Sequence, residues 1–583
     1  FMKLLPSIII FFLLVLILPD VFGQSRIKGK ITDTEGIPVF LANIAIKGNN
    51  IGTMTDQSGN YSLIIPEPGN VTVVVSCVGY KPKEFELSPD LGKTITLDVE
   101  LETDVTEISE VSVSARQNRT GTLRSINLDA LQYSVSTSGS IESMIKTLPG
   151  VTSNTELSSQ YSVRGGNFDE NLVYVNDIEI YRPFLVRSGQ QEGLSFINSD
   201  LVSSVQFSAG GFESRYGDKM SSVLDITYRE PEKFAGSASI SLLGGSAHLE
   251  GKSKNDKLSF LAGYRYKTTS YLLNSLETEG EYKPNFSDFQ TMINYNFSEK
   301  TKLSFLGNIA VNKYTFIPEK GETEFGTSDV PLNLVIYYEG QEIDRFDTYN
   351  GALSLTHQVN PSLKLKFISS VFTTNERETF DILGEYLINE LDNTIGSDTY
   401  GDSILNIGIG GFLNHARNYL NAYVYSAAHK GEYKGRRHHL KWGLKYEYHR
   451  IFDELSEWEM VDSAGFSVSP SNEGLQLWDV IKGKNSHITS RFSTYLQDTW
   501  AFKNNSNEYY FTAGLRSTYI SFNNEILISP RASFSYKPYW ERDMMFYISS
   551  GIYFQPPFYK EMRAPDGILN KKIRSQRSLH IVA

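Results

Sequence analysis

The sequence predicts a mainly β protein made of a small N-terminal β-sandwich, an α+β unit and an antiparallel transmembrane β-barrel. Three features predict this order. Residues 24–102 hold short β-rich runs between turn residues, residues 120–232 mix one helical stretch with strands, and residues 233–583 hold long runs that alternate apolar and polar side chains. The chain has 583 residues, too many for one ordinary core, so several structural units are expected.

The first 23 residues predict a secretory signal peptide. Lys3 supplies a positive charge, residues 4–18 are almost all apolar, and Val21 and Gly23 precede a cleavage point in the pattern of small residues that signal peptidase requires. The alternative is an N-terminal membrane anchor, which would need about 20 apolar residues. No later stretch is apolar enough to predict a transmembrane helix.

Charge and cysteine content exclude several classes of function. Lys plus Arg number 55 and Asp plus Glu number 67, and the net charge of −12 argues against a nucleic-acid partner. The single cysteine, Cys77, excludes an intrachain disulfide and a multi-cysteine metal cluster. No cofactor is expected. The 34 Tyr and 34 Phe residues suit strands and membrane interfaces.

Residues 24–102 carry a recurring set of turn residues between β-rich runs. The set comprises Gly29, Asp33, Gly36, Pro38, the run from Gly52 to Tyr61, and Val78-Gly79-Tyr80. This pattern resembles the carboxypeptidase regulatory-like domain, which implies a β-sandwich. Asp33 and Asp56 are interpreted as turn formers rather than calcium ligands, because Asp close before Gly is a turn signal.

The linker over residues 103–119 is polar and contains one alternating patch, Glu110-Val111-Ser112-Val113-Ser114-Ala115. Such a patch can add itself as a strand to the edge of another protein's sheet. It can equally form an edge strand of a neighbouring domain of the same chain. The local sequence leaves both readings open.

The α+β unit over residues 120–232 begins with a predicted helix at 140–147. Leu148-Pro149-Gly150-Val151 ends this helix, as Pro and Gly should. Strand-like runs follow, one leading into Arg164-Gly165-Gly166 and another into Asn176-Asp177. A glycine-containing block over 211–226 completes the unit.

From residue 233 onward the strands are predicted to have one apolar and one polar face, because successive side chains point to opposite sides of a sheet. In the run over residues 258–267, the apolar face is Leu258, Phe260, Ala262, Tyr264 and Tyr266, and the polar face includes Ser259, Gly263, Arg265 and Lys267. In the run over residues 440–448, the apolar face is Leu440, Trp442, Leu444, Tyr446 and Tyr448, and the polar face includes Lys441, Gly443, Lys445 and Glu447. Short turns are expected near 254–256, 298–301, 360–362, 435–438, 504–507 and 538–542, and long polar connections over 312–350, 373–417 and 451–486. This alternation of short and long connections indicates an outer-membrane barrel. A soluble propeller is the alternative, but no fixed sequence period supports it.

The order of these parts and their motifs resembles the TonB-dependent receptors of the Bacteroidetes type, over almost the entire chain. The motifs that carry the resemblance are Leu148 to Val151, Arg164-Gly165-Gly166, Asn176-Asp177 in place of Asp-Gly, and the block from Gly211 to Ile226. The resemblance implies that residues 120–232 form a plug domain inside the barrel. It also implies roughly 22 strands in a complete barrel, of which about 12–13 are counted here. The sequence therefore looks C-terminally truncated, and Phe1 before Met2 also suggests a fragment.

The resemblance implies an outer-membrane receptor that imports a scarce ligand with energy from the inner-membrane proton gradient. The ligand class stays open among siderophore, cobalamin, oligosaccharide and peptide. The implied partners are TonB with its inner-membrane energising complex, outer-membrane lipid, a small extracellular ligand and a surface lipoprotein. The N-terminal domain would lie in the periplasm. A non-transporting surface receptor or adhesin anchored by the barrel is the alternative function.

The resemblance also implies roles for individual residues. Residues Glu110, Val111, Ser112, Val113, Ser114 and Ala115 resemble the TonB box, which binds TonB. Arg164, Gly165, Gly166 and Arg215 would form plug-to-barrel contacts, in which the arginines pair with carboxylates of the barrel wall. The alternative is that each arginine caps a local turn or faces solvent.

No pattern of residues predicts an enzyme. Ser143 and Lys146 have the spacing of a penicillin-binding enzyme motif, but its partner motifs are missing. His438 and His439 are neighbours on a strand and point to opposite faces, so they are not expected to share a metal ion, with or without His449. The glycine cluster at 408–411 is placed in a long barrel loop.

Overall fold

The structure is a computed structural model that describes residues 25–34, 36–47, 51–65, 69–77, 80–88, 92–102, 121–128, 140–153, 159–181, 195–273, 280–462, 476–504, 507–540 and 544–583. The chain divides into two compact units, residues 1–117 and 118–583. Among the described residues, no helix has both the length and the apolar character needed to cross a membrane. The predicted signal peptide lies outside the described residues.

The first unit is a β-sandwich, as predicted. One sheet contains β1 (Ser25–Asp33), β4 (Asn60–Ile65), β7 (Thr94–Thr96) and β8 (Val99–Leu101), and the other contains β2 (Asn43–Ile46), β3 (Gly52–Met54), β5 (Val71–Ser76) and β6 (Lys83–Leu87). Alternate residues of these strands point between the sheets and are buried, among them Ile27, Ile44, Leu63 and Val73.

The two aspartates of this sandwich form turns. The Asp33 carboxylate accepts a hydrogen bond from the Ile37 backbone N–H at 2.8 Å. The Asp56 carboxylate accepts from the N–H groups of Ser58 and Asn60. These bonds stabilise the two turns, in agreement with the sequence interpretation.

We use the name plug unit for residues 120–232. Its five-stranded sheet has the order β13-β12-β15-β14-β9. The strands are β9 (Arg124–Ile126), β12 (Asn171–Val175), β13 (Ile178–Glu179), β14 (Val202–Ser208) and β15 (Ser222–Tyr228), and β10 (Val151–Thr152) pairs separately with β11 (Ser162–Val163). The helix α3 (Ile141–Ile145) confirms the predicted short helix. Short 3₁₀ helices, η2 (Phe168–Glu170) and η3 (Ser199–Leu201), precede β12 and β14.

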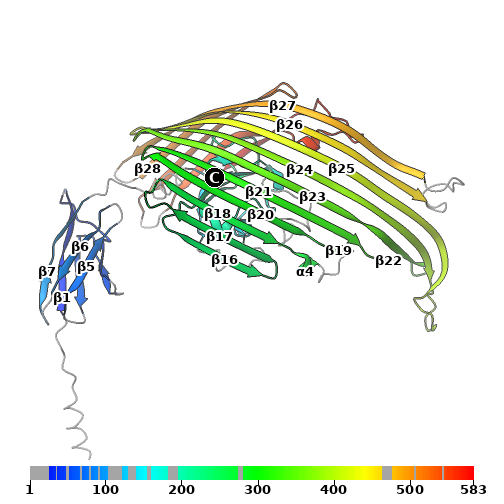
Figure 1. The fold of residues 1–583 in the computed structure, drawn as a ribbon, viewed down its shortest axis with the longest axis horizontal. Helices are drawn as coiled ribbons and strands as arrows, with labels where there is room; N and C mark the ends of the chain where they lie inside the picture. Colours follow the sequence, from blue (N-terminus) through cyan, green and yellow to red (C-terminus); the bar gives the residue numbers. More distant parts are fainter. Residues whose placement is uncertain are drawn as a thin grey trace, which may run out of the picture. The chain divides into compact units, whose positions relative to one another are not determined.

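The rest of the chain forms one large antiparallel sheet, whose main path runs from β16 to β31 (Figure 1). Its strands are β16 (Ala235–Ser241), β17 (Gly244–Lys252), β18 (Leu258–Lys267), β20 (Asn285–Ser298), β21 (Thr301–Pro318), β23 (Pro331–Asn360), β24 (Leu363–Leu391), β25 (Ser403–Lys434), β26 (His438–Asp462), β27 (Gln476–Lys503), β28 (Asn507–Ile520), β29 (Glu525–Pro538), β30 (Phe546–Gln555) and β31 (Gln576–Val582). The short strands β19 (Gly280–Tyr282) and β22 (Gly321–Gly326) pair with β21 and β23. The short helices α4 (Ser270–Leu273) and η4 (Tyr559–Met562) lie in its connections.

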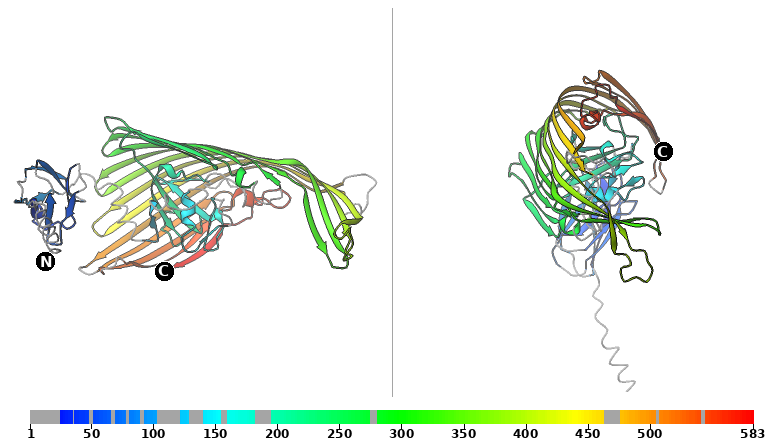
Figure 2. Two further views of the ribbon diagram at one scale, coloured as in Figure 1. Left: turned by 90° about the horizontal axis from the view of Figure 1, so that it is seen from below. Right: turned by 90° about the vertical axis from the view of Figure 1, so that its right-hand side faces the viewer.

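The sheet curves around the plug unit, which lies on its concave side (Figure 2). We call this concave face the wall. The predicted short turns all connect neighbouring strands of this sheet, for example at residues 298–301 between β20 and β21. The path holds one strand more than the 12–13 predicted from the sequence, because β16 was not recognised. Its residues, Ala-Gly-Ser-Ala-Ser-Ile-Ser, are mostly small, so its two faces differ little in polarity.

The strands of the sheet have two different faces, as predicted. In β21, Asn308 and Asn312 are buried on the wall side, whereas Ile309 between them is half exposed on the outward side. In β26, Leu444 points outward and is 60% exposed, while Lys445 points to the plug unit. This polar interior and apolar exterior is the pattern of outer-membrane barrels.

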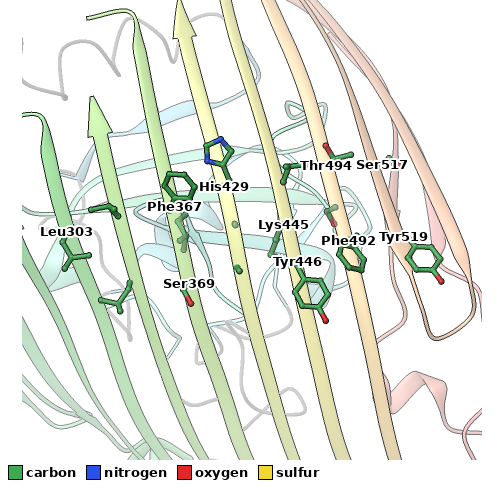
Figure 3. Close-up of a pocket in the computed structure, with 17 residues that line it drawn as sticks. Leu303, Phe367, Ser369, His429, Lys445, Tyr446, Phe492, Thr494, Ser517 and Tyr519 are labelled. Carbon is green, nitrogen blue, oxygen red and sulfur yellow. The ribbon is translucent and has the colours of Figure 1, made fainter. Parts of the chain in front are cut away.

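The outward apolar face contains a hollow of about 910 Å³ (Figure 3). Large side chains such as Phe367, Tyr446 and Phe492 surround it, and the smaller Ser369 and Thr494 lie among them. The exposed large apolar side chains continue this face over the neighbouring strands, so the outward side of the sheet is suited to contact lipid.

The predicted long polar connections are mostly strand. Residues 331–360 of β23 pair with 363–391 of β24, and β25 and β26 pair over similar lengths. The glycine cluster at 408–411 therefore lies within β25 and not in a loop. Beyond the reach of lipid a strand needs no apolar face, so the two-residue alternation that marks a strand in sequence is lost there.

Candidate functional site

The contact between the plug unit and the wall is the candidate functional site. The plug carboxylates that take part include Asp177, Glu179, Glu213 and Asp218. Asp177 lies at the turn between β12 and β13, Glu179 lies in β13, and the other two lie in the connection between β14 and β15. Asn176 and Asp177 both have positive φ angles, of 51° and 68°, as a tight two-residue hairpin turn requires.

Each of these carboxylates pairs with a cation of the wall. The distances are 2.8 Å for Asp177 to Lys366 of β24, 2.6 Å for Glu179 to Lys445 of β26, 3.2 Å for Glu213 to Lys441 of β26 and 3.0 Å for Asp218 to Arg516 of β28. Lys430 of β25 adds a hydrogen bond of 2.7 Å to the Asp177 carbonyl oxygen. The plug unit is thus held by charge-assisted bonds to four strands of the wall, β24, β25, β26 and β28.

The wall cations keep the plug carboxylates ionised. Burial acts to raise the pKa of Glu213, but Lys441 and Arg215 outweigh burial and bring this pKa down to about 2. Burial also opposes ionisation of Asp218, yet Arg516 and Lys445 bring its pKa down to about 2. Lys366 holds the pKa of Asp177 well below its ordinary value.

These pKa shifts predict a pH window for the seating of the plug unit. Carboxylates with lowered pKa values stabilise the seated state fully above their ordinary pKa of about 4, and this stabilisation is lost as pH falls toward about 2. Pepsin cleavage of the plug unit, normalised to cleavage of an unfolded substrate, should stay low at pH 5 and rise as pH falls from 4 to 2. A flat normalised cleavage rate over this range would contradict the prediction.

A loop of the plug unit from Phe212 to Asp218 fits most closely into the wall. Arg531 of β29 donates to the carbonyl oxygens of Phe212, Glu213 and Tyr216, the latter two at 2.7 and 2.6 Å. The Tyr553 hydroxyl of β30 also donates to the Phe212 carbonyl oxygen, at 2.9 Å. The Phe212 ring packs edge-on against Tyr553 with centroids 4.6 Å apart.

Two glycines allow this close approach. A Cβ atom on Gly217 would lie 1.8 Å from the Nε atom of Arg516. Gly211 has a φ of +68°, and its N–H donates to the Nδ1 atom of His580 on β31 at 3.1 Å. The glycines of the 211–226 block therefore let the backbone lie directly on the wall.

Arg215 has a different position from the one expected. Its guanidinium pairs with Asp225 at 2.7 Å and lies 3.9 Å from both Asp177 and Glu213, which all belong to the plug unit. The Cζ atom of Arg215 lies 4.4 Å from the centroid of the Tyr216 ring. Among the described residues, Arg215 thus organises the acids of its own unit, and it borders a cavity of about 70 Å³ between plug unit and wall.

Arg164, Gly165 and Gly166 form a turn on the plug unit. Arg164 is exposed with a φ of 50°, and its N–H donates to the Gly150 carbonyl oxygen at 2.8 Å. A Cβ on Gly166 would meet Ser221 of the same unit. In the described part of the chain, Arg164 makes no ion pair with a wall carboxylate. The four ion pairs given above thus have the opposite polarity to the expected one, with the acid on the plug unit and the base on the wall. Arg229 of the plug unit, 3.9 Å from Glu250 of β17, forms a pair of the expected polarity.

The wall cations were partly visible in the sequence. Lys441 and Lys445 stand on the predicted polar face of their strand. The sequence did not show which residues these lysines pair with, because Glu179 and Lys445, for example, are 266 positions apart. The TonB-box-like segment, Glu110 to Ala115, lies outside the described residues, so its TonB-binding role stays a prediction.

The residues considered for catalysis have structural roles. The Ser143 hydroxyl donates to the Ser140 carbonyl oxygen at 2.5 Å in the first turn of α3. His438 lies by Asp498 and His439 by Glu432. Within the described residues no group of three His, Cys, Asp or Glu side chains is arranged to hold a metal ion.

Comparison with known families supports this picture of the chain. The CarboxypepD_reg-like domain family matches residues 27–113, and the TonB-dependent Receptor Plug Domain family matches residues 116–222. The chain thus contains a CarboxypepD_reg-like domain and a TonB-dependent receptor plug domain. TonB-dependent receptors are outer-membrane β-barrel proteins.

Two curated relatives align with part of the chain. The TonB-dependent receptor SusC of Bacteroides thetaiotaomicron is 27% identical over 251 residues, which is 41% of this chain and 24% of SusC. The TonB-dependent receptor P39 of Formosa agariphila is 26% identical over 204 residues, which is 34% of this chain and 19% of P39. The matched regions thus span about a quarter or less of each relative.

Solved structures with similar folds include an importer and a receptor. The RagAB peptide importer in its closed-closed state has a TM-score of 0.49 at 10% identity, covering 79% of this chain and 65% of that one. BauA, the ferric preacinetobactin receptor of Acinetobacter baumannii, has a TM-score of 0.47 at 10% identity, covering 79% of this chain and 68% of that one.

Proposed function

We propose that the protein is a TonB-dependent importer of a scarce ligand across the outer membrane, with its N-terminal domain in the periplasm. The observation that carries this proposal is the polar contact between plug unit and wall. Ion pairs and hydrogen bonds in a hydrated lumen can be exchanged for bonds to water at small net cost. A plug unit held in this way can be released without unfolding the surrounding sheet.

The order of the chain provides a route for force. The linker over residues 103–119 directly precedes β9, which is the edge strand of the plug sheet. β9 pairs with β14 over only three residue pairs, from Val205↔Ile126 to Phe207↔Arg124. A pull on the linker therefore acts first on a short edge strand, which has few bonds to break before the load reaches the core of the plug unit.

TonB would supply the pull. Residues 110–115 would join a TonB sheet as an added strand, in which main-chain hydrogen bonds provide affinity and alternate side chains provide selectivity. A surface receptor or adhesin would need neither this segment nor a releasable plug. The ligand class stays open among siderophore, cobalamin, oligosaccharide and peptide, and a surface lipoprotein is a further candidate partner.

Proline substitutions in the TonB-box-like segment test this function. Val111→Pro with Val113→Pro removes two backbone donors needed for strand addition. We expect uptake to fall to background while surface binding stays unchanged, measured with whichever of a ferric siderophore, cobalamin, an oligosaccharide or a peptide binds the cells. Ser112→Ala with Ser114→Ala is the matched control and should import normally. Persistent uptake in the proline variant would remove the TonB assignment.

A further inference from the structure

The connection between β30 and β31, residues 556–575, folds onto the wall; we name it the inner strap. It contains η4 and lies on the concave side of the sheet, where Figure 2 shows it in red beside the plug unit. Its tip turns at Gly567, which has a φ of +80°, and its two arms are joined by a bridge between Arg563 and Leu569. The inner strap is thus an ordered hairpin-like element inside the curve of the sheet.

Two cations of the inner strap pair with acids of the wall. Lys560 lies 2.8 Å from Glu378 and 3.4 Å from Glu376, both on β24. Arg563 lies 2.5 Å from Asp453 on β26. Glu376 and Asp453 are 3% and 5% exposed, so each would be a buried, poorly solvated charge if the strap left without a replacement cation.

Apolar and backbone contacts extend this attachment. Tyr559 is buried against Leu420 and Ala422 of β25 and Ile451 of β26. The Asn485 side chain of β27 donates to the Gly567 carbonyl oxygen at 2.8 Å. Farther along, Asn523 donates to the Ile573 carbonyl oxygen at 2.9 Å. The inner strap therefore touches the wall from β24 to the β28–β29 turn and crosses its concave face.

The inner strap lies next to the plug unit along the same strands. Tyr181, at the end of the described plug segment after β13, packs against Phe372 of β24 and His449 of β26, with ring centroids 4.9 and 5.6 Å away. The strap contacts Glu376 of β24 and Ile451 of β26. Glu376 comes four residues after Phe372 and Ile451 comes two residues after His449, so each lies on the same face of its strand as the residue that Tyr181 contacts. At roughly 3.3 Å per residue, the wall contacts of the strap and those of Tyr181 are about 7–13 Å apart along the strands.

Direction along the strands shows which side the strap covers. From Phe372 to Glu376, β24 runs away from its short turn at residues 360–362 and toward the long hairpin that it forms with β25. The inner strap therefore lies between the plug unit and the long-hairpin side of the sheet. A solute that enters the lumen from that side meets the strap before it meets Tyr181.

We propose that the inner strap is an autoinhibitory closure of the lumen. In its closed position Lys560 and Arg563 occupy the wall acids, and the strap blocks the approach to the plug unit. It opens when these two cations leave Glu376, Glu378 and Asp453. The proposal rests on the proposed import function, since a blocked lumen has meaning only for a protein through which a solute passes.

The rate at which a cysteine at position 181 reacts from outside the cell tests the closure. Tyr181→Cys is introduced in the full-length receptor with the native Cys77 replaced by Ser, and intact cells are treated with a membrane-impermeant, charged maleimide. Lys560→Met with Arg563→Met should speed labelling at least tenfold. Lys572→Met with Arg574→Met removes the same charges from exposed positions of the same strap and should leave the rate unchanged.

A charge exchange guards against a variant that merely misfolds. Arg563→Glu alone should speed labelling, and adding Asp453→Arg should slow it again toward the original rate. Equal labelling rates with and without Lys560 and Arg563 would overturn the proposal, as would failure of the exchange to slow the reaction. Labelling needs no TonB coupling, so this result is independent of the uptake test with Val111 and Val113.

Discussion

Replacing Arg531 with Met is expected to let large solutes leak through the receptor. Arg531 is 7% exposed and donates to three backbone carbonyl oxygens of the plug loop at Phe212, Glu213 and Tyr216. Methionine fills similar space but leaves the buried Tyr216 carbonyl oxygen without the Arg531 donor and takes one donor from those of Phe212 and Glu213, at a cost on the order of 3 kcal/mol. Since about 1.4 kcal/mol changes an equilibrium tenfold, the open population should rise by roughly a hundredfold.

The measurement is the sensitivity of cells to vancomycin, which is too large for most general porins. Cells with the Arg531→Met receptor should be inhibited at a concentration at least tenfold lower than cells with the unchanged receptor. Arg436→Met, at an exposed turn between β25 and β26, is the matched control and should have no effect. An Arg531 variant with unchanged sensitivity would show that this residue does not seat the plug unit.

The second large effect is expected at Asp218. Its carboxylate pairs with Arg516 at 3.0 Å and accepts from the Thr518 hydroxyl at 3.2 Å, and both members of the pair are nearly buried. Asp218→Asn leaves the Arg516 guanidinium buried without a counter-charge, which costs about 3–5 kcal/mol. The plug unit should then be cleaved by trypsin in the folded receptor at a concentration at least tenfold lower.

A double-mutant cycle separates this ion pair from general damage. Arg516→Met alone should also weaken seating, whereas Arg516→Met with Asp218→Asn should lose less than the sum of the two single variants. Glu299→Gln, at the exposed β20–β21 turn, is the control for loss of one acid. Strict additivity of the two single effects would mean that Asp218 and Arg516 do not act through each other.

Much of the fold could be predicted because, in a strand with one polar and one apolar face, the polarity of the side chains alternates with a two-residue period. The run from Leu258 to Lys267 showed this period, and Arg265 does point inward, where it pairs with Asp288 of the next strand at 2.5 Å. Strands without this contrast were not recognised. β16 has Ser237, Ser239 and Ser241 on one face and only Gly236, Ala238 and Ile240 on the other, and the outer parts of β23 to β27 mix apolar and polar residues on both faces.

The candidate site could be predicted in kind but not in detail. The resemblance assigned the 211–226 block to a plug domain inside the barrel, and in the structure Gly217 of this block lies directly against Arg516 of the wall. The sequence did not indicate which member of each ion pair belongs to the plug unit. The polar face of a strand shows which charged side chains point inward, but not the residues with which they pair. Arg215 illustrates this limit: it stays among Asp177, Glu213 and Asp225 of its own unit, whose acids then meet Lys366 and Lys441.

The central claim is that the plug unit must move relative to the wall for import, and a reversible covalent tether tests it most directly. A Cβ built on Gly514 of β28 would lie 2.9 Å from the Cβ of Ser214 in the plug loop, close enough for a disulfide after a small shift. Ser214→Cys with Gly514→Cys, in a receptor whose Cys77 is Ser, tethers plug unit to wall. Thr499→Cys with Thr512→Cys tethers β27 to β28 within the wall and is the matched control.

The account predicts that oxidation of the Ser214–Gly514 cysteine pair reduces uptake to background without loss of ligand binding, and that dithiothreitol restores uptake. Oxidation of the control pair should leave uptake unchanged. Normal uptake by a receptor whose plug tether is fully formed would contradict the account.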